Sequence, residues 1–598
     1  MKIIRALLPL CVATLAFAAP DGADLYTKNC AVCHEVLTVL QNHVALKTMS
    51  PDYIVRTLTI GIMRGQAAKL SVDERAAIAE FLTGKAALPT RADSAGRCTG
   101  EPSKSLGGPQ WNGWGVDLEN TRFQPGEAAG ITADQVPKLK LKWAFGFPGD
   151  YSTISQPAIA GGRVFVGSAA GIVYSLDATS GCTYWSFQAQ SGVRGAITIG
   201  PGDIAYFGDL HANVYALDAN TGKLIWQTEA DDYPTARVTA SPKLYEGRLY
   251  VAVASRDEWF SADSRFECCK FRGSVLALDA KTGKQIWKTY TISEPAHPTT
   301  KTKAGTQLWG PSGVGVWTSP TIDTKRKVLY VGTGDGYSEP ATPHSDSILA
   351  LELNTGKIAW AHQITEGDVF NGNCIQPKPT TCPDKVGPDS DFGSSPILRT
   401  LPSGRRVLIA GQKSGAVHAL DPDNKGKLLW QTRVGKGGML GGIQWGPAAD
   451  PETAFVALSD LGLIPAPEGV MPDPKAGGGI FALQISTGEK LWSVLPPPEG
   501  CHTPHCSPAQ SAAVTAIPGV VFSGSLDGHL RAYAAKDGKI LWDYDTAKDF
   551  ETVNGVPGKG GSLDGPGPAI AGGIMVVNSG YGFFNGMPGN VLLAFGAE

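Results

Sequence analysis

Two cysteines and a histidine near the N-terminus have the spacing of a covalent attachment site. Cys30-Ala-Val-Cys33-His34 matches the Cys-x-x-Cys-His motif of c-type haem, in which both thiols bond to the porphyrin and the histidine ligates the iron. A zinc site is the alternative, but it would need two further ligands nearby. We therefore predict haem c on Cys30 and Cys33, with His34 as one axial ligand.

The second axial ligand should be a methionine or a histidine in the segment that ends at Leu82. Met63 comes before the run Ser71-Val-Asp-Glu, a capping pattern that predicts a helix continuing to Leu82. A methionine loop followed by a last helix is similar to the end of a small cytochrome c. Met63 is therefore the predicted ligand, with Met49 and His43 as alternatives, and methionine ligation would raise the reduction potential of the haem.

Residues 1–18 have the pattern of a secretory signal peptide. A basic start at Lys2 and Arg5 is followed by an apolar stretch and by Ala16-Phe-Ala18, which suits cleavage. We expect export to the periplasm and no further membrane span, because no other apolar run is long enough to cross a bilayer. The net charge of −3 gives no argument for a nucleic-acid partner.

A repeated unit of strand, tight turn and strand indicates the scaffold. The stretch Val214-Tyr-Ala-Leu-Asp-Ala-Asn-Thr-Gly-Lys-Leu-Ile-Trp226 alternates apolar residues, supplies Asp, Asn and Gly for a turn, and ends on tryptophan. Similar units end at Trp143, Trp185, Trp287, Trp360, Trp430, Trp492 and Trp542. A strand repeat of about 40 residues or more is typical of a β-propeller. The alternative, a two-sheet sandwich, does not explain regular tryptophan-marked repeats.

The two ends of the repeat region contain complementary half-units. Leu139-Lys-Leu-Lys-Trp143 lacks a first half, and Asn590-Val-Leu-Leu-Ala-Phe595 lacks a second half. Pairing them in space would close the ring and leave no open sheet edge. The predicted fold is an all-β eight-bladed β-propeller preceded by a small all-α cytochrome c domain. The expected boundaries are a signal peptide at 1–18, the cytochrome domain at 19–88, a linker at 89–106 and the propeller at 107–598.

The spacing between successive tryptophans is longest in the blades that end at Trp287, Trp360, Trp430 and Trp492. The additional residues must lie in loops, and long loops on a rigid scaffold carry binding and catalytic sites. We therefore expect the functional residues in these blades.

Eight cysteines remain after the haem pair and Cys11 are set aside, an even number that suits an exported protein. The pairs Cys374–Cys382 and Cys501–Cys506 are close enough in sequence to staple their own loops, and Cys98 and Cys182 could then tie the linker to an early blade. The adjacent Cys268 and Cys269 either bond to each other in a strained ring or bond to two other cysteines.

The haem motif, the eight blades and the adjacent cysteines together resemble the quinohaemoprotein alcohol dehydrogenases, which hold pyrroloquinoline quinone (PQQ) at the centre of an eight-bladed propeller. The resemblance covers essentially the whole mature chain. It is carried by the strings Glu267-Cys-Cys-Lys-Phe-Arg-Gly-Ser274, Trp309-Gly-Pro-Ser-Gly-Val-Gly-Val-Trp317, Gly387-Pro-Asp-Ser-Asp-Phe-Gly-Ser-Ser-Pro396 and Gly586-Met-Pro-Gly-Asn590. Within that family, the strings are most similar to those of cytochrome-type polyvinyl alcohol dehydrogenases.

The resemblance implies a site for PQQ and calcium in the blades with long loops. Glu258 and Asp335 fall where the family places calcium-binding side chains, and hard oxygen ligands suit that ion. Trp317 matches the indole on which the quinone stacks. Arg194 and Thr239 fall where relatives hold the carboxylates of the quinone.

The residues of the reaction are also implied by the resemblance. Asp391 matches the base that takes the alcohol proton, with Asp389 and then Asp368 as alternatives. Lys413 matches the cation that hydrogen-bonds the reactive quinone carbonyl.

The adjacent cysteines depart from the family order. In methanol dehydrogenase-like relatives they precede the blade that holds the equivalent of Arg194, whereas Cys268 and Cys269 follow Glu258. They would either cap the quinone face opposite Trp317 or shape the substrate entrance.

The implied activity is the oxidation of secondary alcohol groups of polyvinyl alcohol to ketones, with electrons passing through the haem to a soluble cytochrome c. One alternative is a quinohaemoprotein that acts on small alcohols. A non-catalytic propeller scaffold is the alternative from another class, but it would have no use for haem or for the carboxylates at Glu258 and Asp335.

Overall fold

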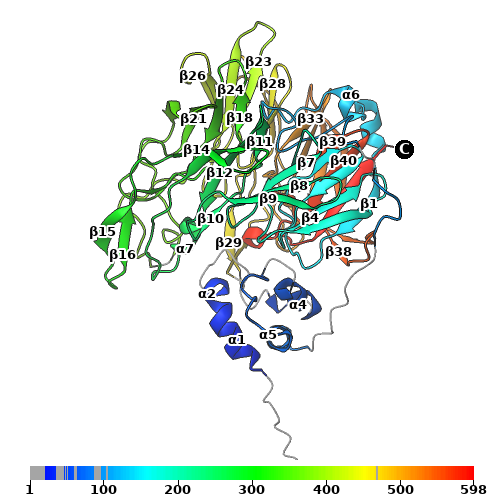
Figure 1. Ribbon diagram of the computed structural model, residues 1–598. Helices are drawn as coiled ribbons and strands as arrows, with labels where there is room; N and C mark the ends of the chain where they lie inside the picture. Colours follow the sequence, from blue (N-terminus) through cyan, green and yellow to red (C-terminus); the bar gives the residue numbers. More distant parts are fainter. Residues whose placement is uncertain are drawn as a thin grey trace, which may run out of the picture.

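The computed structural model describes residues 20–35, 46–47, 49, 51–59, 63–85, 96–102, 105–376, 378–466 and 469–597. The expected signal peptide, His43 and part of the expected linker lie outside these residues and stay predictions. The described part consists of a small helical domain and a large β-propeller (Figure 1), which confirms the predicted fold class. None of the helices described is long and apolar enough to cross a membrane.

The small domain is built from α1 (Gly22–Asn29), α2 (Ala31–His34), α4 (Pro51–Thr59) and α5 (Val72–Thr83). The predicted cap is present at the start of α5, where the Ser71 hydroxyl accepts from the Glu74 backbone N–H at 3.2 Å and the Glu74 carboxylate accepts from the Ser71 N–H at 2.7 Å. The core of this domain contains Tyr26, Ile54, Val55, Leu58, Ala67, Ile78, Ala79 and Leu82. Apart from Ala67, which lies between α4 and α5, these side chains come from the three helices α1, α4 and α5.

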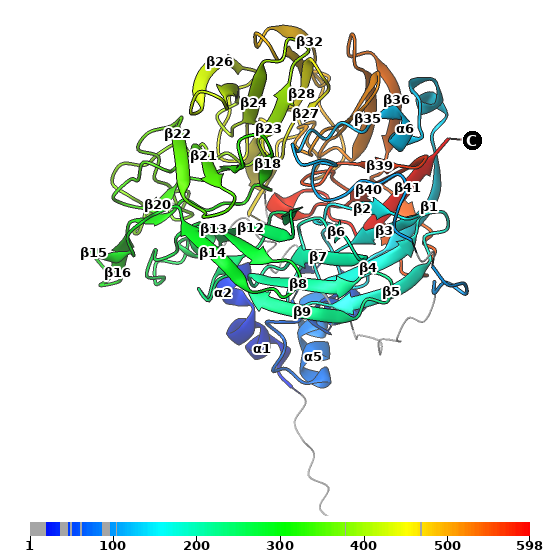
Figure 2. The ribbon, with the colours of Figure 1, turned by 45° about the horizontal axis from the view of Figure 1, so that its top comes forward.

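Eight antiparallel sheets of the described chain form the blades of the propeller (Figure 2). Three successive blades contain β2 (Ala158–Ala160), β3 (Arg163–Val166), β4 (Ile172–Asp177) and β5 (Thr183–Gln188); β6 (Thr198–Gly200), β7 (Ile204–Gly208), β8 (Asn213–Asp218) and β9 (Leu224–Glu229); and β10 (Ala236–Arg237), β11 (Lys243–Tyr245), β12 (Arg248–Ser255), β13 (Ser274–Asp279) and β14 (Gln285–Tyr290).

The next four blades continue in the same strand order. They contain β18 (Thr321–Asp323), β19 (Val328–Gly332), β21 (Ser347–Glu352) and β22 (Ile358–Gln363); β23 (Ile397–Thr400), β24 (Arg406–Gly411), β25 (Ala416–Asp421) and β26 (Lys427–Arg433); β27 (Ala448–Ala449), β28 (Thr453–Ala457), β31 (Ile480–Gln484) and β32 (Lys490–Val494); and β33 (Thr515–Ile517), β34 (Val520–Gly524), β35 (His529–Ala534) and β36 (Ile540–Asp545).

The last blade closes the ring as the half-units predict. β1 (Lys140–Gly146) pairs antiparallel with β41 (Val591–Gly596), and β40 (Ile574–Ser579) and β39 (Ala569–Ala571) complete the sheet. The first strand of the propeller thus lies outermost in this blade, and its ladder with the C-terminal strand joins the two ends of the ring.

The long loops carry additional short elements. These are the two-stranded sheets β15 (His297–Lys301) with β16 (Gln307–Gly310), β17 (Ser312–Gly313) with β20 (Gly336–Ser338), β29 (Leu463–Ala466) with β30 (Gly469–Pro472), and β37 (Asp549–Phe550) with β38 (Gly558–Lys559), and the short helices α6 (Gly126–Ala129), η1 (Ala133–Lys138), α7 (Asp257–Phe260) and η2 (Phe583–Asn585).

The tryptophan of each repeat joins its blade to the next one. The Trp185 indole N–H donates to the Ala219 carbonyl at 2.9 Å, and Gly222 of the same turn lies against the indole ring. Gly222 has φ +72°, and a Cβ there would lie 2.7 Å from Trp185 Cδ2, so only glycine satisfies both the turn and the contact. The same pairing joins Trp143 to Gly181, Trp226 to Gly283, Trp287 to Gly356, Trp360 to Gly426, Trp430 to Gly488 and Trp492 to Gly538.

All the disulfides that the sequence suggests are present. Cys374 bonds to Cys382, Cys501 to Cys506, and Cys268 to its neighbour Cys269. Cys98 bonds to Cys182 and ties the segment between the domains to the first complete blade. The adjacent cysteines therefore bond to each other, and the alternative of two ordinary bonds is wrong.

The helical domain lies against one side of the propeller in both ribbon views (Figures 1 and 2). The Thr57 hydroxyl donates to the Gly149 carbonyl at 3.3 Å, and the Arg64 guanidinium donates to the Ala189 carbonyl. The two domains thus make specific polar contacts.

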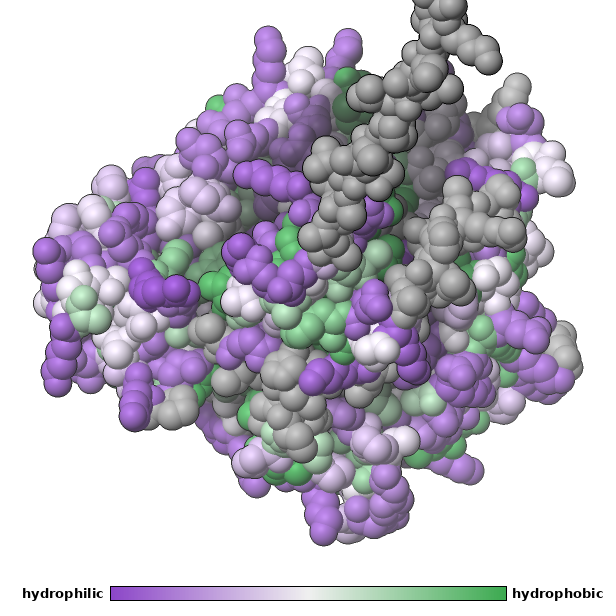
Figure 3. All heavy atoms as spheres, turned by 90° about the horizontal axis from the view of Figure 1, so that it is seen from below, coloured by the Kyte–Doolittle hydropathy of each residue, from purple (hydrophilic) through white to green (hydrophobic). Residues whose placement is uncertain are grey.

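On the face seen from the side of the helical domain, hydrophilic residues predominate and apolar ones are scattered among them (Figure 3).

A buried arginine fastens the segment before β1 to a distant blade. Arg122 donates to the Val514 carbonyl at 2.6 Å, to the Thr515 hydroxyl at 3.1 Å and to the Gln156 side chain at 3.2 Å. Its guanidinium also lies 5.3 Å from the centre of the Trp111 ring. Burial lowers the pKa of Arg122 to about 9. The charge of the guanidinium is tolerated in the interior because polar acceptors surround it.

We predict that Arg122→Met lowers the stability of the propeller. The substitution leaves several buried acceptors without a donor, which should decrease the free energy of unfolding by roughly 2–5 kcal/mol. Urea unfolding followed by tryptophan fluorescence measures the change. The matched control is Arg405→Met at an exposed arginine, which should shift stability by no more than about 0.5 kcal/mol. Equal unfolding midpoints for both variants would contradict this role of Arg122.

Candidate active site

A cavity of about 270 Å³ lies where the propeller meets the helical domain. Cys33, Met63 and Gln66 of the helical domain line it, and loops from the propeller supply the remaining wall. The cavity therefore joins the haem motif to the centre of the ring.

The propeller residues of the cavity come from two kinds of loop. Arg194, Trp317 and Asp391 lie just before β6, β18 and β23, which are the innermost strands of their blades. Asp335 and Lys413 lie just after β19 and β24, the second strands of two blades. In each blade, the loop before the first strand and the loop after the second strand lie at the same end, because these two strands are antiparallel. Residues from blades far apart in sequence therefore contribute to one site.

Three buried side chains form an ion-paired cluster. Lys413 Nζ lies 2.7 Å from Asp389 Oδ1 and 2.7 Å from Asp391 Oδ2. The second oxygen of Asp391 accepts from the Asp335 backbone N–H at 2.7 Å. Burial lowers the pKa of Lys413, but the carboxylates of Asp389, Asp391 and Glu258 outweigh this effect and raise the pKa well above its usual value. Lys413 is therefore held as an ammonium that orients two carboxylates.

The carboxylates outnumber this ammonium and suit a hard cation. One oxygen each of Asp335, Asp389 and Asp391 lies within 4.8 Å of the others, and Glu258 lines the same cavity. Both carboxylate oxygens of Asp335 are buried without a hydrogen-bond partner. Burial raises the pKa of Glu258 to about 7, with Lys413 opposing the shift, and burial followed by Asp391 raises that of Asp335. Such an all-oxygen donor set fits calcium or a similar ion.

Trp317 forms a flat wall beside this acidic group. A Cβ on Gly393 would lie 2.2 Å from Trp317 Cη2, and one on Gly334 would lie 2.8 Å from Asp391 Oδ1. The absence of side chains at both glycines thus allows the indole and the carboxylate to sit side by side. Trp445 packs edge-on against Trp317 at 5.6 Å between ring centres. A planar aromatic ligand can therefore stack on Trp317 with one edge at the carboxylates.

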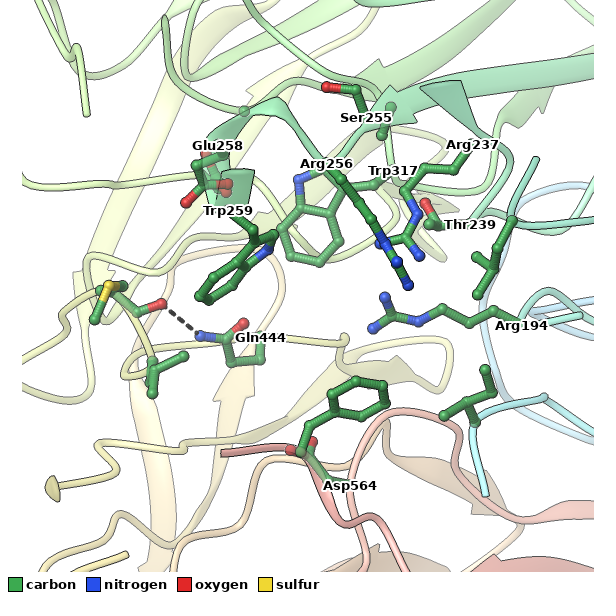
Figure 4. Close-up of a pocket in the computed structure, with 18 of the residues that line it drawn as sticks. Arg194, Arg237, Thr239, Ser255, Arg256, Glu258, Trp259, Trp317, Gln444 and Asp564 are labelled. Atoms are coloured by element: carbon green, nitrogen blue, oxygen red, sulfur yellow. Dashed lines mark hydrogen bonds between the residues drawn. The ribbon is translucent and has the colours of Figure 1, made fainter. Parts of the chain in front are cut away.

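Three arginines mark the other end of the cavity. Arg194, Arg237 and Arg256 direct their guanidinium groups towards one another, close to Thr239 (Figure 4). Arg237 Nε and the Thr239 hydroxyl are buried without a hydrogen-bond partner. These orphaned groups fit a ligand with carboxylates, such as PQQ.

The haem motif borders the same cavity. Cys30 and Cys33 are free, half-buried thiols, and His34 lies beside them on α2. Met49 and Met63 both pack against the core of the helical domain, and of these two only Met63 lines the cavity. The described residues thus fit covalent haem c, and the choice of Met63 as the second ligand stays a prediction.

Most of the site residues predicted in the propeller meet in this cavity, and three do not. Arg194, Thr239, Glu258, Trp317, Asp335, Asp389, Asp391 and Lys413 line it. Asp368, the third candidate base, instead accepts from the backbone N–H groups of Asp389 at 3.2 Å and Ser390 at 2.8 Å. It shapes the loop and does not line the cavity.

The adjacent cysteines also lie outside the residues that line the cavity. Cys268 Sγ is 3.8 Å from the Tyr337 carbonyl and 3.7 Å from the Asn371 side-chain nitrogen. The Tyr337 side chain lines the cavity at this place. The disulfide therefore lies behind Tyr337, and its expected role at the quinone face or at the substrate entrance stays a prediction.

Sequence reasoning missed several residues of the site, namely Arg237, Arg256, Trp259, Tyr337, Trp445 and Asp564. Trp445 could have been found, because, like Trp317, it lies outside the repeat position of the tryptophans. The arginines carry no such signal, since an arginine in a loop is most often exposed.

Three family models match parts of the chain. The β-propeller domain of glucose/ethanol/alcohol dehydrogenase matches residues 111–387, and the cbb3-type subunit III of cytochrome C oxidase matches residues 17–82. The outer membrane protein assembly factor BamB matches residues 344–584. The first two agree with a propeller of the quinone-dependent dehydrogenases and with a cytochrome c domain.

Whole-chain relatives and solved structures agree with these matches. A quinohemoprotein alcohol dehydrogenase of Pseudomonas putida HK5 aligns with a TM-score of 0.61 at 19% identity over 85% of this chain and 83% of that one, which shows the fold. A polyvinylalcohol dehydrogenase of Pseudomonas sp is 42% identical over 97% of this chain and 94% of that protein. A polyvinylalcohol dehydrogenase of Sphingopyxis sp. (strain 113P3) is 37% identical over 97% of this chain and 93% of that protein. This chain therefore belongs to the polyvinyl alcohol dehydrogenase family, PQQ-dependent alcohol dehydrogenases that combine an eight-bladed propeller with a cytochrome c domain.

Proposed function

We propose that this enzyme oxidises the secondary alcohol groups of polyvinyl alcohol to ketones in the periplasm and passes the electrons through haem c to a soluble cytochrome c. The observation that carries the proposal is the shared cavity, whose wall includes Asp391 and Lys413 of the propeller and Cys33 of the haem motif. Reduction of PQQ by the alcohol and its reoxidation by the haem would then occur at neighbouring positions.

The side chains of the cavity have different roles in the proposed reaction. PQQ bound on Trp317 would supply a quinone carbonyl carbon able to accept the hydride of the carbinol carbon. Asp391 takes the hydroxyl proton, because its carboxylate is held by Lys413 at 2.7 Å and by the Asp335 N–H at 2.7 Å. Lys413 donates a hydrogen bond where negative charge develops.

Calcium is the cation proposed for the acidic group. Glu258 and Asp335 would be its side-chain ligands, and the unpartnered oxygens of Asp335 support this choice. A divalent ion would offset the excess of carboxylates over ammonium and polarise an oxygen bound beside it.

The proposed polymer substrate has support from the relatives and from the cavity wall. Two relatives named polyvinylalcohol dehydrogenase match nearly the whole chain. The wall includes the apolar side chains Ile154, Leu210, Trp259, Phe260, Met439, Leu440, Leu461 and Phe583. Such a wall suits the methylene backbone that flanks each hydroxyl of the polymer. An enzyme for small alcohols is the alternative.

We predict that the enzyme loaded with PQQ and calcium turns over polyvinyl alcohol and 2-hexanol and is much less active on ethanol. The reason is that an apolar wall binds the carbon chains beside a secondary carbinol, which ethanol lacks. Steady-state rates with a dye acceptor measure the preference. Activity on ethanol that equals or exceeds activity on the other two would favour the small-alcohol alternative.

We predict that Glu258→Gln and Asp335→Asn each weaken calcium binding by about 100-fold or more, because each removes a hard ligand from a shell with few protein oxygens. Calorimetric titration of the metal-free protein measures the affinity. Glu267→Gln, which removes an exposed carboxylate paired with Lys270, is the matched control. Unchanged affinity in both site variants would remove these residues from the metal site.

We predict that Asp391→Asn slows reduction of the bound quinone by a secondary alcohol by roughly 10²- to 10⁴-fold, because an amide cannot accept the proton. Asp389→Asn should have a smaller effect, since it loses a partner of Lys413 but keeps the base. Rapid-mixing absorbance separates this step from electron transfer to haem. The reverse order of the two effects would assign the base to Asp389.

A further inference from the structure

Three half-buried arginines without carboxylate partners meet in the cavity. Arg194, Arg237 and Arg256 are brought together from a loop before β6, from β10 and from the end of β12 (Figure 4). In the part of the chain that the structure describes, no ion pair within 4.0 Å involves any of them, whereas Arg406 pairs with Asp323 at 2.8 Å and Asp423 at 2.6 Å.

The contacts that these arginines do make are neutral. Arg194 lies 4.3 Å from the centre of the Trp445 ring and donates to the Tyr581 hydroxyl at 3.4 Å. The Asp564 carboxylate interacts electrostatically with Arg194, but its backbone partner is the Gly565 N–H, from which it accepts at 2.6 Å. Arg237 Nε has no partner at all in this buried place. Its pKa is lowered well below the usual value, first by burial and then by Arg256 and Arg194.

This arrangement costs folding free energy, in contrast to the arginine that fastens the ring. The guanidinium of Arg122 is surrounded by acceptors from Val514, Thr515 and Gln156. Three like charges that face one another in a low-dielectric interior repel, and the buried, unpaired Arg237 Nε has lost its hydrogen bond to water. A group of charges that opposes folding is typical of a binding site whose ligand supplies the opposite charge.

The cavity is polarised along its length. Trp317 lies between Glu258 on one side and the three arginines on the other (Figure 4). Arg256 comes two residues before Glu258, so the end of β12 and the first turn of α7 supply a residue to each end. A planar quinone with three carboxylates can place its carbonyl edge at the acidic, metal-binding end and still direct carboxylates to the guanidinium groups.

We propose that Arg237 and Arg256 join Arg194 in a guanidinium subsite that binds the carboxylates of PQQ and makes the site selective for an anionic quinone. The inference rests on the proposed placement of PQQ on Trp317. The planar fork of arginine forms paired hydrogen bonds with a carboxylate, and the unpartnered Thr239 hydroxyl supplies one more donor beside them.

The test measures PQQ binding by the full-length, haem-containing chain after PQQ and metal have been removed. Arg237→Gln and Arg256→Gln should each raise the Kd for PQQ by roughly 10- to 100-fold, because each removes a charge-assisted hydrogen bond. With PQQ trimethyl ester, which carries no carboxylates, each variant should differ from the unmodified chain by no more than about threefold. Quenching of tryptophan fluorescence at saturating calcium gives the Kd.

A second readout separates this role from a structural one. In the absence of PQQ, each variant should raise the Tm by about 1–3 °C, because it removes one of three repelling charges. A structural arginine would lower the Tm, as expected for Arg122→Gln. The matched binding control is Arg272→Gln. Arg272 is a half-buried arginine outside the cavity that donates to the Ile292 carbonyl, so the Kd of this variant for PQQ should equal that of the unmodified chain.

The outcomes distinguish this inference from the proposed function. If Trp317→Ala weakens PQQ binding but both arginine variants keep the original Kd, PQQ binds here and the guanidinium subsite is wrong. Equal losses of affinity for PQQ and its trimethyl ester, with a lowered Tm, would also overturn it. Failure of Trp317→Ala to affect binding would overturn the placement of PQQ itself. If Arg237→Gln does not fold, Arg256→Gln gives the same comparisons.

Discussion

The packing of seven of the eight repeat tryptophans on a turn glycine of the next blade is the contact on which the ring depends. At Trp185 and Gly222, the indole N–H bonds to the backbone of the neighbouring turn while its ring covers a residue with positive φ and no Cβ. One glycine therefore satisfies two constraints, the local conformation of a turn and the close approach of two blades. Since the contact recurs around the molecule, successive blades have a similar orientation, and pairing of β1 with β41 closes the sheet edges.

A ring of this kind can hold charges that a less rigid structure would not. Its loops converge at one end and bring together Asp389, Asp391 and Lys413 in a buried cluster, while Arg237 and Arg256 meet elsewhere in the same cavity. Separated acidic and basic ends oppose folding in the interior, but they are complementary to a ligand that carries both metal-binding and anionic groups. The cohesion of the blades offsets this local cost.

The helical domain completes the cavity that the propeller begins. The disulfide between Cys98 and Cys182 ties the connecting segment to the first complete blade, and contacts such as that of Thr57 with Gly149 hold the helices against the ring. Cys33 and Met63 thereby become part of the same wall as the residues of the propeller. A haem attached at Cys30 and Cys33 would consequently lie next to the quinone site, a position that suits electron transfer between them.

The sequence by itself determined the repeat, the closing half-units, the haem motif and the helix cap at Ser71, because each is a local pattern of turn residues, apolar alternation or fixed spacing. Only the tertiary structure decided which loop residues face the cavity. Asp391 and Asp368 read alike as turn carboxylates, yet the first lines the cavity and the second binds backbone N–H groups. Arg237 and Arg256 had no sequence signal at all. The physical reason is that a ring places residues of distant blades side by side, and the direction of a loop side chain depends on neighbours that are remote in sequence.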